Sequence, residues 1–176
     1  TVLLGVLMSL AIGGSVDLPL LQVADIHLAW GFVAWGVVLL AAVAYVVVPM
    51  FQLTPNYPQW FDGRYLAAAI GVTAVWSVIH WFWPALISVV AGAAVLAVAL
   101  SFAAVTLWVQ AKSKRPRLDP TQHLWRGAML SALAAGLLWL VAMTIPVVGE
   151  WPGWPMLLGV LVLFGGFVSV IIGMLY

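Results

Sequence analysis

The sequence contains no cysteine and very little charge. Only 6% of its 176 residues are Asp, Glu, Lys or Arg, and its formal net charge is +1. The lack of cysteine excludes disulfides, thiolate metal sites and cysteine nucleophiles. The near-zero net charge argues against nucleic acid as a partner, because proteins bind phosphate backbones through an excess of Lys and Arg. Glycine-rich nucleotide-binding patterns and P-loops are also absent.

Apolar residues make up 66% of the chain, and 11 of its residues are tryptophan. A soluble domain carries about a quarter charged residues, because its surface must be hydrated. We expect a chain this apolar to have the lipid bilayer as its surroundings, with tryptophans in the interfacial layers. The composition therefore predicts an all-α, polytopic membrane helix bundle that forms a single membrane domain over residues 1–176.

Apolar runs between polar or Pro-rich breaks divide the chain into six predicted transmembrane helices. A helix needs about 20 apolar residues to cross a bilayer core about 30 Å thick. The predicted spans cover about residues 1–16, 26–50, 64–83, 85–110, 122–147 and 154–176. The first span is short, and both ends of the sequence are apolar, so we expect a piece of a longer chain. Its partner would be another membrane subunit, a missing segment or a second copy in a homo-oligomer.

Basic residues gather on one side of these six spans. They comprise Arg64, at the start of the third span, and five residues in the loop 111–121 or just after it: Lys112, Lys114, Arg115, Arg117 and Arg126. By the positive-inside rule this loop is cytoplasmic, which predicts a multi-pass protein of the bacterial inner (plasma) membrane. We interpret the basic loop as a topology signal, with binding of anionic lipid or of a partner as the alternative.

Two segments predict where helices end and begin. In "PMFQLTPNYPQWF", residues 49–61, three prolines lack a backbone donor and disfavour helix at the preceding residue. This segment predicts a helix that ends near residue 50, followed by an ordered non-helical turn at the interface. A docking loop for another subunit is the alternative. "LDPTQ", residues 118–122, predicts a helix start with Asp119 or Thr121 as N-cap.

The three histidines are the residues most suited to chemistry. The predicted topology places His27 and His80 near the outer ends of adjacent spans, and His123 on the cytoplasmic side. Histidine within a span usually faces a cavity, a cofactor or a hydrogen-bond partner. Two imidazoles across a helix bundle can hold haem iron. The pattern therefore predicts His27 and His80 as metal ligands of a haem b. The alternative is that each is an interfacial polar residue bonded to a carbonyl or headgroup.

Small residues follow His27 along one face of its span. Gly31 and Ala34 lie at helical spacing from it and would admit a flat ring. On the span of His80 the corresponding stripe is Ala69, Thr73 and Trp76, which leaves less room. We therefore include Gly31 and Ala34 in the predicted cofactor site.

The stretch "HLAWGFVAWGVVLLAAVAYVVVPMFQLTPNYP", residues 27–58, resembles the haem–copper oxidase subunit I superfamily in its broad sense, including the NnrS-type haem and copper membrane proteins. The resemblance implies that His27 occupies the position of a low-spin haem ligand near the outer end of a helix. Paired histidines, a His-x-His pattern, an "HPEVY"-like stretch and an outer arginine for haem propionates are missing. Copper is therefore not expected from this chain alone.

Three functions follow from these features. The first is a b-type haem-binding membrane protein, oxidase-like in part, for electron transfer or for haem or nitric oxide handling. The second is a permease-like bundle, and the third is a non-catalytic membrane subunit that packs against a partner. If the chain is an enzyme, we expect an oxidoreductase-related haem protein. We do not expect a hydrolase, because no nucleophile–base pair is recognisable in the sequence.

Overall fold

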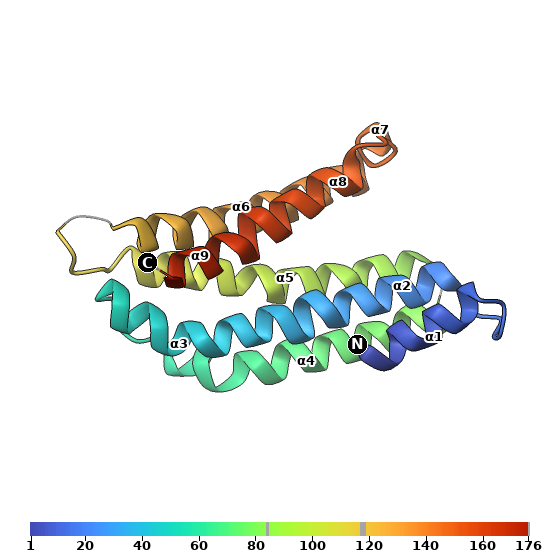
Figure 1. Cartoon of the computed structure of the whole chain (residues 1–176), viewed down its shortest axis with the longest axis horizontal. Helices are drawn as coiled ribbons and strands as arrows, with labels where there is room; N and C mark the ends of the chain where they lie inside the picture. Colours follow the sequence, from blue (N-terminus) through green and yellow to red (C-terminus); the bar gives the residue numbers. More distant parts are fainter. Residues whose placement is uncertain (84, 117–118, 176) are drawn as a thin grey trace. The chain divides into compact units, whose positions relative to one another are not determined.

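The computed structural model describes residues 1–83, 85–116 and 119–175 (Figure 1). All regular secondary structure in this part of the chain is helical, which confirms the all-α prediction. Of the residues named above, Arg117 lies outside the described ranges.

In the residues that the structure describes, ten helical stretches follow the short first helix, α1 (Val2–Ile12). They are α2 (Leu20–Ala29), η1 (Trp30–Val37), α3 (Val38–Gln52), α4 (Gln59–Phe82), α5 (Ala85–Gln110), α6 (Pro120–Thr144), α7 (Pro146–Gly149), α8 (Trp154–Gly159), η2 (Val160–Val168) and α9 (Ser169–Leu175). Here η marks a π-helical segment. α2, η1 and α3 run on without a break, and so do α8, η2 and α9.

Five helical segments in the described ranges are long and apolar enough to cross a membrane. They are Leu20–Gln52, Gln59–Phe82, Leu86–Gln110, Pro120–Thr144 and Trp154–Leu175. Only 11% to 28% of the residues in their apolar windows are buried within the protein. Such large exposed apolar surfaces are not stable in water, so they agree with a multi-pass membrane protein.

The first predicted span, residues 1–16, is not confirmed as a membrane crossing. α1 has 11 residues, which at a rise of about 1.5 Å per residue is about 16 Å long. This is about half of a bilayer core. The second span also begins earlier than predicted, at Leu20 instead of about residue 26, because the helix takes in the polar residues Gln22 and Asp25.

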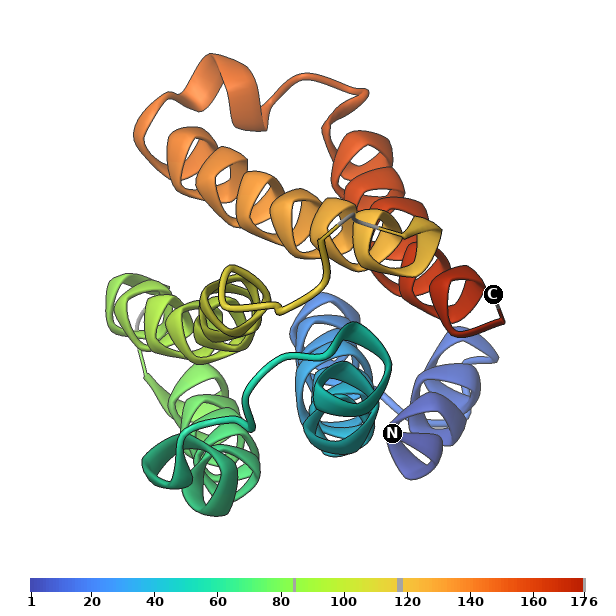
Figure 2. The ribbon, with the colours of Figure 1, turned by 90° about the vertical axis from the view of Figure 1, so that its left-hand side faces the viewer.

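The chain forms two compact units. Unit 1 comprises residues 1–43 and 59–99, and unit 2 comprises residues 44–58 and 100–176. In unit 1, α1 packs against α2, and α4 packs against α2 and η1. In unit 2, α6 runs beside η2 and α9, as Figures 1 and 2 both show.

The helix that begins at Leu20 ends at Gln52, with Pro49 inside its last turn. Leu53, the next residue, has a φ of 50°, the left-handed conformation that commonly ends a helix. Residues 53–58 are not helical and α4 starts at Gln59, so the predicted turn is confirmed. The helix nevertheless continues past Pro49, although the sequence placed its end near there.

The two π-helical segments each contain two glycines. In η2 the wider turn shifts the backbone carbonyls out of the usual α-helical pattern. The carbonyl of Leu161 accepts a hydrogen bond of 2.9 Å from Ser131 Oγ on α6. A side chain at Gly165 would collide with Ser131, so this glycine lets the two helices approach closely.

Candidate functional site

His27 lies on α2 in unit 1, on the face that α1 covers. A Cβ placed on Gly5 of α1 would lie 3.4 Å from Cε1 of His27, and one on Gly31 would lie 3.9 Å from Thr1. The two glycines therefore let α1 and α2 come together beside the imidazole. Gly31 and Ala34, the predicted lining residues, are both half-buried.

The imidazole of His27 is only partly satisfied. Its Nδ1 is buried and has no hydrogen-bond partner within the described chain. A buried polar atom without a partner costs about 1–3 kcal/mol. The role of His27 as a metal ligand stays a prediction.

His80 is held differently, by groups from three helices of unit 1. Its Nδ1 lies 2.5 Å from Ser88 Oγ on α5, and its Nε2 lies 3.3 Å from Asp25 Oδ2 on α2. Its ring stacks on Trp76, with centroids 4.9 Å apart and planes at 19°. Both ring nitrogens of His80 therefore face polar side chains of the same unit.

The two predicted ligands consequently have different neighbours: His27 faces α1, whereas His80 faces Asp25 and Ser88. Among the described residues, no group of three or more His, Asp or Glu side chains is arranged to hold a metal ion. The shared haem remains a prediction. The hydrogen bond between Ser88 and His80 is a contact that the sequence analysis did not single out.

The signal for that pair was present in the sequence. Ser88 follows His80 by eight residues, across the tight connection between α4 and α5. Two helices joined by a short connection are antiparallel, so residues at similar distances from it come together. Neither Ser88 nor Asp25 was singled out in the sequence analysis.

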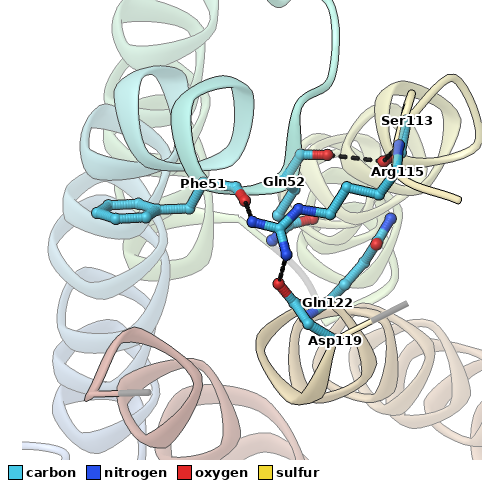
Figure 3. Close-up of polar contacts among 6 residues, drawn as sticks. All are labelled: Phe51, Gln52, Ser113, Arg115, Asp119 and Gln122. Atoms are coloured by element: carbon cyan, nitrogen blue, oxygen red, sulfur yellow. Dashed lines mark hydrogen bonds and ion pairs between the residues drawn. The ribbon is translucent and has the colours of Figure 1, made fainter. Parts of the chain in front are cut away.

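A second polar cluster lies in unit 2, where α3 ends and the basic segment 113–119 passes (Figure 3). The guanidinium of Arg115 donates to the carbonyl of Phe51 at 2.5 Å and pairs with Asp119. Ser113 Oγ donates to the carbonyl of Gln52 at 2.6 Å, and Figure 3 shows these contacts side by side. The amide of Lys114 donates to the carbonyl of Leu53 at 3.0 Å.

These bonds give the basic segment a structural role. The last carbonyls of a helix have no partner within the helix, and here Ser113, Lys114 and Arg115 supply donors to three consecutive carbonyls at the end of α3. Asp119 also accepts a hydrogen bond of 2.8 Å from the amide of Gln122. This confirms Asp119 as the N-cap of α6 and leaves Thr121 as an ordinary helical residue.

Three glutamines of unit 2 are fully buried, and the sequence analysis did not single them out: Gln52, Gln110 and Gln122. Gln110 Nε2 donates to Gln52 Oε1 at 2.9 Å. Nε2 of Gln52, Oε1 of Gln110 and both amide atoms of Gln122 have no partner in the described residues. On the neighbouring turn, Arg126 donates to the carbonyl of Gln110 at 3.1 Å.

Tyr57 adds a buried hydroxyl in the turn that follows α3. Its OH lies 3.0 Å from Thr106 Oγ1, and its ring meets Tyr45 edge-on at 5.0 Å. Burial raises the pKa of Tyr57 above that of an exposed tyrosine, because the phenolate would be poorly solvated. His123 is exposed on α6, in keeping with its interpretation as an interfacial residue.

No protein-family model, curated protein or solved structure matches this chain. The resemblance of residues 27–58 to the haem–copper oxidase superfamily therefore stays a prediction.

Proposed function

We propose that this chain is a b-type haem-binding protein of the bacterial inner membrane, with His27 as one axial ligand. The observation that carries the proposal is the buried, unpartnered Nδ1 of His27 on a helix long enough to span the bilayer. Nitrogen of a neutral imidazole is a common ligand of haem iron. Gly31 and Ala34, one and two turns after His27, have the small side chains that a flat ring requires.

This chain offers one histidine, and not two, that is free to be an axial ligand of haem. His80 is already engaged with Ser88 and Asp25, and α1 covers the face of α2 that carries His27. We therefore propose that the second ligand comes from a partner: another membrane subunit, a missing segment or a second copy. His80 would be the second axial ligand only if Asp25 moved away from its Nε2. When bound, the haem would supply electron transfer or the handling of haem or nitric oxide.

For the orientation, we propose six crossings, with α1 forming part of the first and with loop 111–121 on the cytoplasmic side. Five apolar helices and the one-sided basic residues support this arrangement. The acidic residues Asp17, Asp25 and Glu150 would then lie on the outer side. Cysteine labelling from each side of the membrane at Ser113 and Ser15 tests it, and outer access to position 113 would reverse the orientation.

Haem binding is tested by the absorption spectrum of the purified full chain with added haemin. We expect a Soret band that saturates at one haem per chain and is lost in His27→Ala. His123→Ala is the matched control, because its imidazole is exposed, and it should retain the band. Size-exclusion elution and helix content establish that each variant is folded. A wild-type protein without a saturable Soret band, or His27→Ala with an unchanged one, would refute the proposal.

The alternative is a membrane subunit without cofactor that packs against another helix. Positions Gly71, Gly127 and Gly159 favour it, because a Cβ there would meet no atom within 4 Å. Small residues on apolar helices allow a second helix to approach closely. This alternative predicts no haem and a loss of oligomers in Gly127→Leu.

A further inference from the structure

Ser88 and His80 have the geometry of a nucleophile and its base. Ser88 Oγ lies 2.5 Å from His80 Nδ1, and Ser88 is only 5% exposed. A serine hydroxyl is a weak nucleophile unless a neighbouring base accepts its proton. At this distance the proton can pass directly to the imidazole.

Trp76 and Asp25 lie against that imidazole. Asp25 Oδ2 lies 3.3 Å from Nε2, although Nε2 makes no hydrogen bond within the described residues. With the ring proton on Nε2, Nδ1 is left to accept from Ser88. Trp76 stacks on the ring and donates to the carbonyl of Ser88 at 3.2 Å. Serine, histidine and aspartate in this order form an arrangement that recurs on unrelated folds and is recognised by its geometry.

The position of Ser88 also favours a developing negative charge. It is the fourth residue of α5, which begins at Ala85. The N–H groups of the first helical turn have no carbonyl partner within the helix, and the positive end of the helix dipole lies there. The positive end of the α5 dipole would therefore favour a tetrahedral oxyanion formed at Ser88.

An apolar groove between α4 and α5 adjoins this pair through Trp76, which lines the groove and stacks on His80. It has a volume of about 240 Å³ and is lined by Gly71, Val72, Val75, Trp76, Ala91 and Ala94. Trp76 and Val72 lie one and two turns before His80, while Ala91 and Ala94 lie one and two turns after Ser88. The groove thus follows the two helix faces that carry the reactive pair. Gly92 leaves room for the Trp76 indole, since a Cβ there would lie 3.2 Å from Nε1.

We propose that Ser88 is an activated nucleophile that accepts fatty acyl groups from esters, with the acyl chain in this groove. Ser88 Oγ attacks the carbonyl carbon of the ester, and its proton passes to His80 Nδ1. The bond from that carbon to the alcohol oxygen breaks, and the alcohol leaves with the proton from His80. Water then cleaves the acyl-serine in the same way, which releases the acid and restores Ser88. Asp25 acts as a positioning residue.

The first test is reaction of the full chain, in detergent micelles, with a fluorescent fluorophosphonate, in which a serine oxygen displaces fluoride from phosphorus. We expect labelling at Ser88, lost in Ser88→Ala and slowed at least 100-fold in His80→Gln. Asp25→Asn should slow it at least 10-fold, with partial recovery in Asp25→Glu. Ser77→Ala is the matched control: Ser77 is on α4 and bonds to Trp30 and Thr73 but to no histidine. No labelling of the wild type, or labelling that survives Ser88→Ala, would overturn the proposal.

A second variant covers the case in which replacement of His80 or Asp25 prevents folding. In Ser88→Cys the imidazole should favour the thiolate, so that iodoacetamide alkylates it at least 10-fold faster than Ser77→Cys. Equal rates, or a slower rate at position 88, would contradict activation by His80.

The groove is tested separately with p-nitrophenyl esters of different lengths. Ala94→Trp should fill the groove and lower kcat/KM for the octanoate at least 10-fold while that for the butyrate is retained. An equal fall for both esters would show that the groove does not hold the acyl chain.

Discussion

The side-chain amide of Gln110 donates a 2.9 Å hydrogen bond to that of Gln52, and neither residue is exposed. Gln52 Nε2 and Gln110 Oε1 have no partner within the described residues. The same is true of both side-chain amide atoms of Gln122. Gln52 and Gln110 lie at the ends of α3 and α5, and Gln122 lies near the start of α6.

The first prediction concerns this glutamine pair. Gln110→Leu leaves the buried Gln52 amide without its partner, so it should lower the free energy of unfolding by about 1–3 kcal/mol. Gln52→Leu should have a similar effect, and the double variant should lose less than the sum of the two. Unfolding in mixed micelles of rising SDS content measures these values. Gln59→Leu, at an exposed position, is the control with little change. Additive losses would show that the pair is not coupled.

Leu53 carries the second prediction. Its φ of 50° is unfavourable for a residue with a Cβ, and it is half exposed, so little packing depends on its side chain. Leu53→Gly should raise the free energy of unfolding by about 0.5–1 kcal/mol. Met50→Gly, also exposed but inside α3, should lower it by about 1 kcal/mol, since glycine weakens a helix interior. Destabilisation by both variants would exclude a left-handed conformation at Leu53 in the membrane.

The helices were largely predictable from the sequence, whereas the contacts of their polar residues were not. Apolar runs located the five long helices because a bilayer requires such runs. Gln22 and Asp25 were assigned to a loop, yet a helix end near the membrane surface can include polar residues. Pro49 did not end its helix, because the loss of one backbone bond is tolerated in a membrane helix when neighbouring groups compensate.

The site residues show why the contacts of the polar side chains could not be predicted from the sequence. The predicted depth of His27 and His80 in the membrane follows from counting residues, but the direction of each ring depends on which helix packs beside it. Glycines at positions 5 and 31 bring α1 onto the face of His27, and the α4–α5 connection brings Ser88 to His80. Burial of Gln52, Gln110 and Gln122 arises in the same way, where three helix ends meet, and no local pattern signals it.

The third prediction concerns pH. Because burial raises the pKa of Tyr57 in the folded state, the folded protein favours the neutral phenol. This contribution is fully present below the pKa of an exposed tyrosine, about 10, and is lost as the pH rises above that value towards the folded pKa. The free energy of unfolding should therefore fall as the pH rises above about 10. Tyr57→Phe should show a smaller fall over the same range, and an equal fall in both proteins would assign it to other groups.

The fourth prediction concerns the closest helix contact of unit 2. A methyl group at Gly165 of η2 would collide with Ser131 on α6, which bonds to the carbonyl of Leu161. Gly165→Ala should lower the free energy of unfolding by about 1–3 kcal/mol, because close-packed helices cannot absorb the added atom without moving apart.

Gly159→Ala is the matched control for this contact, since a Cβ at Gly159 meets no atom within 4 Å. It should leave stability unchanged or raise it by up to about 1 kcal/mol, the difference in helix propensity between alanine and glycine. Combining Gly165→Ala with Ser131→Gly removes the side chain in the way of the methyl group. The double variant should therefore recover part of the loss, whereas no recovery would mean that Gly165 is required for the π-helical backbone of η2 and not for its approach to α6.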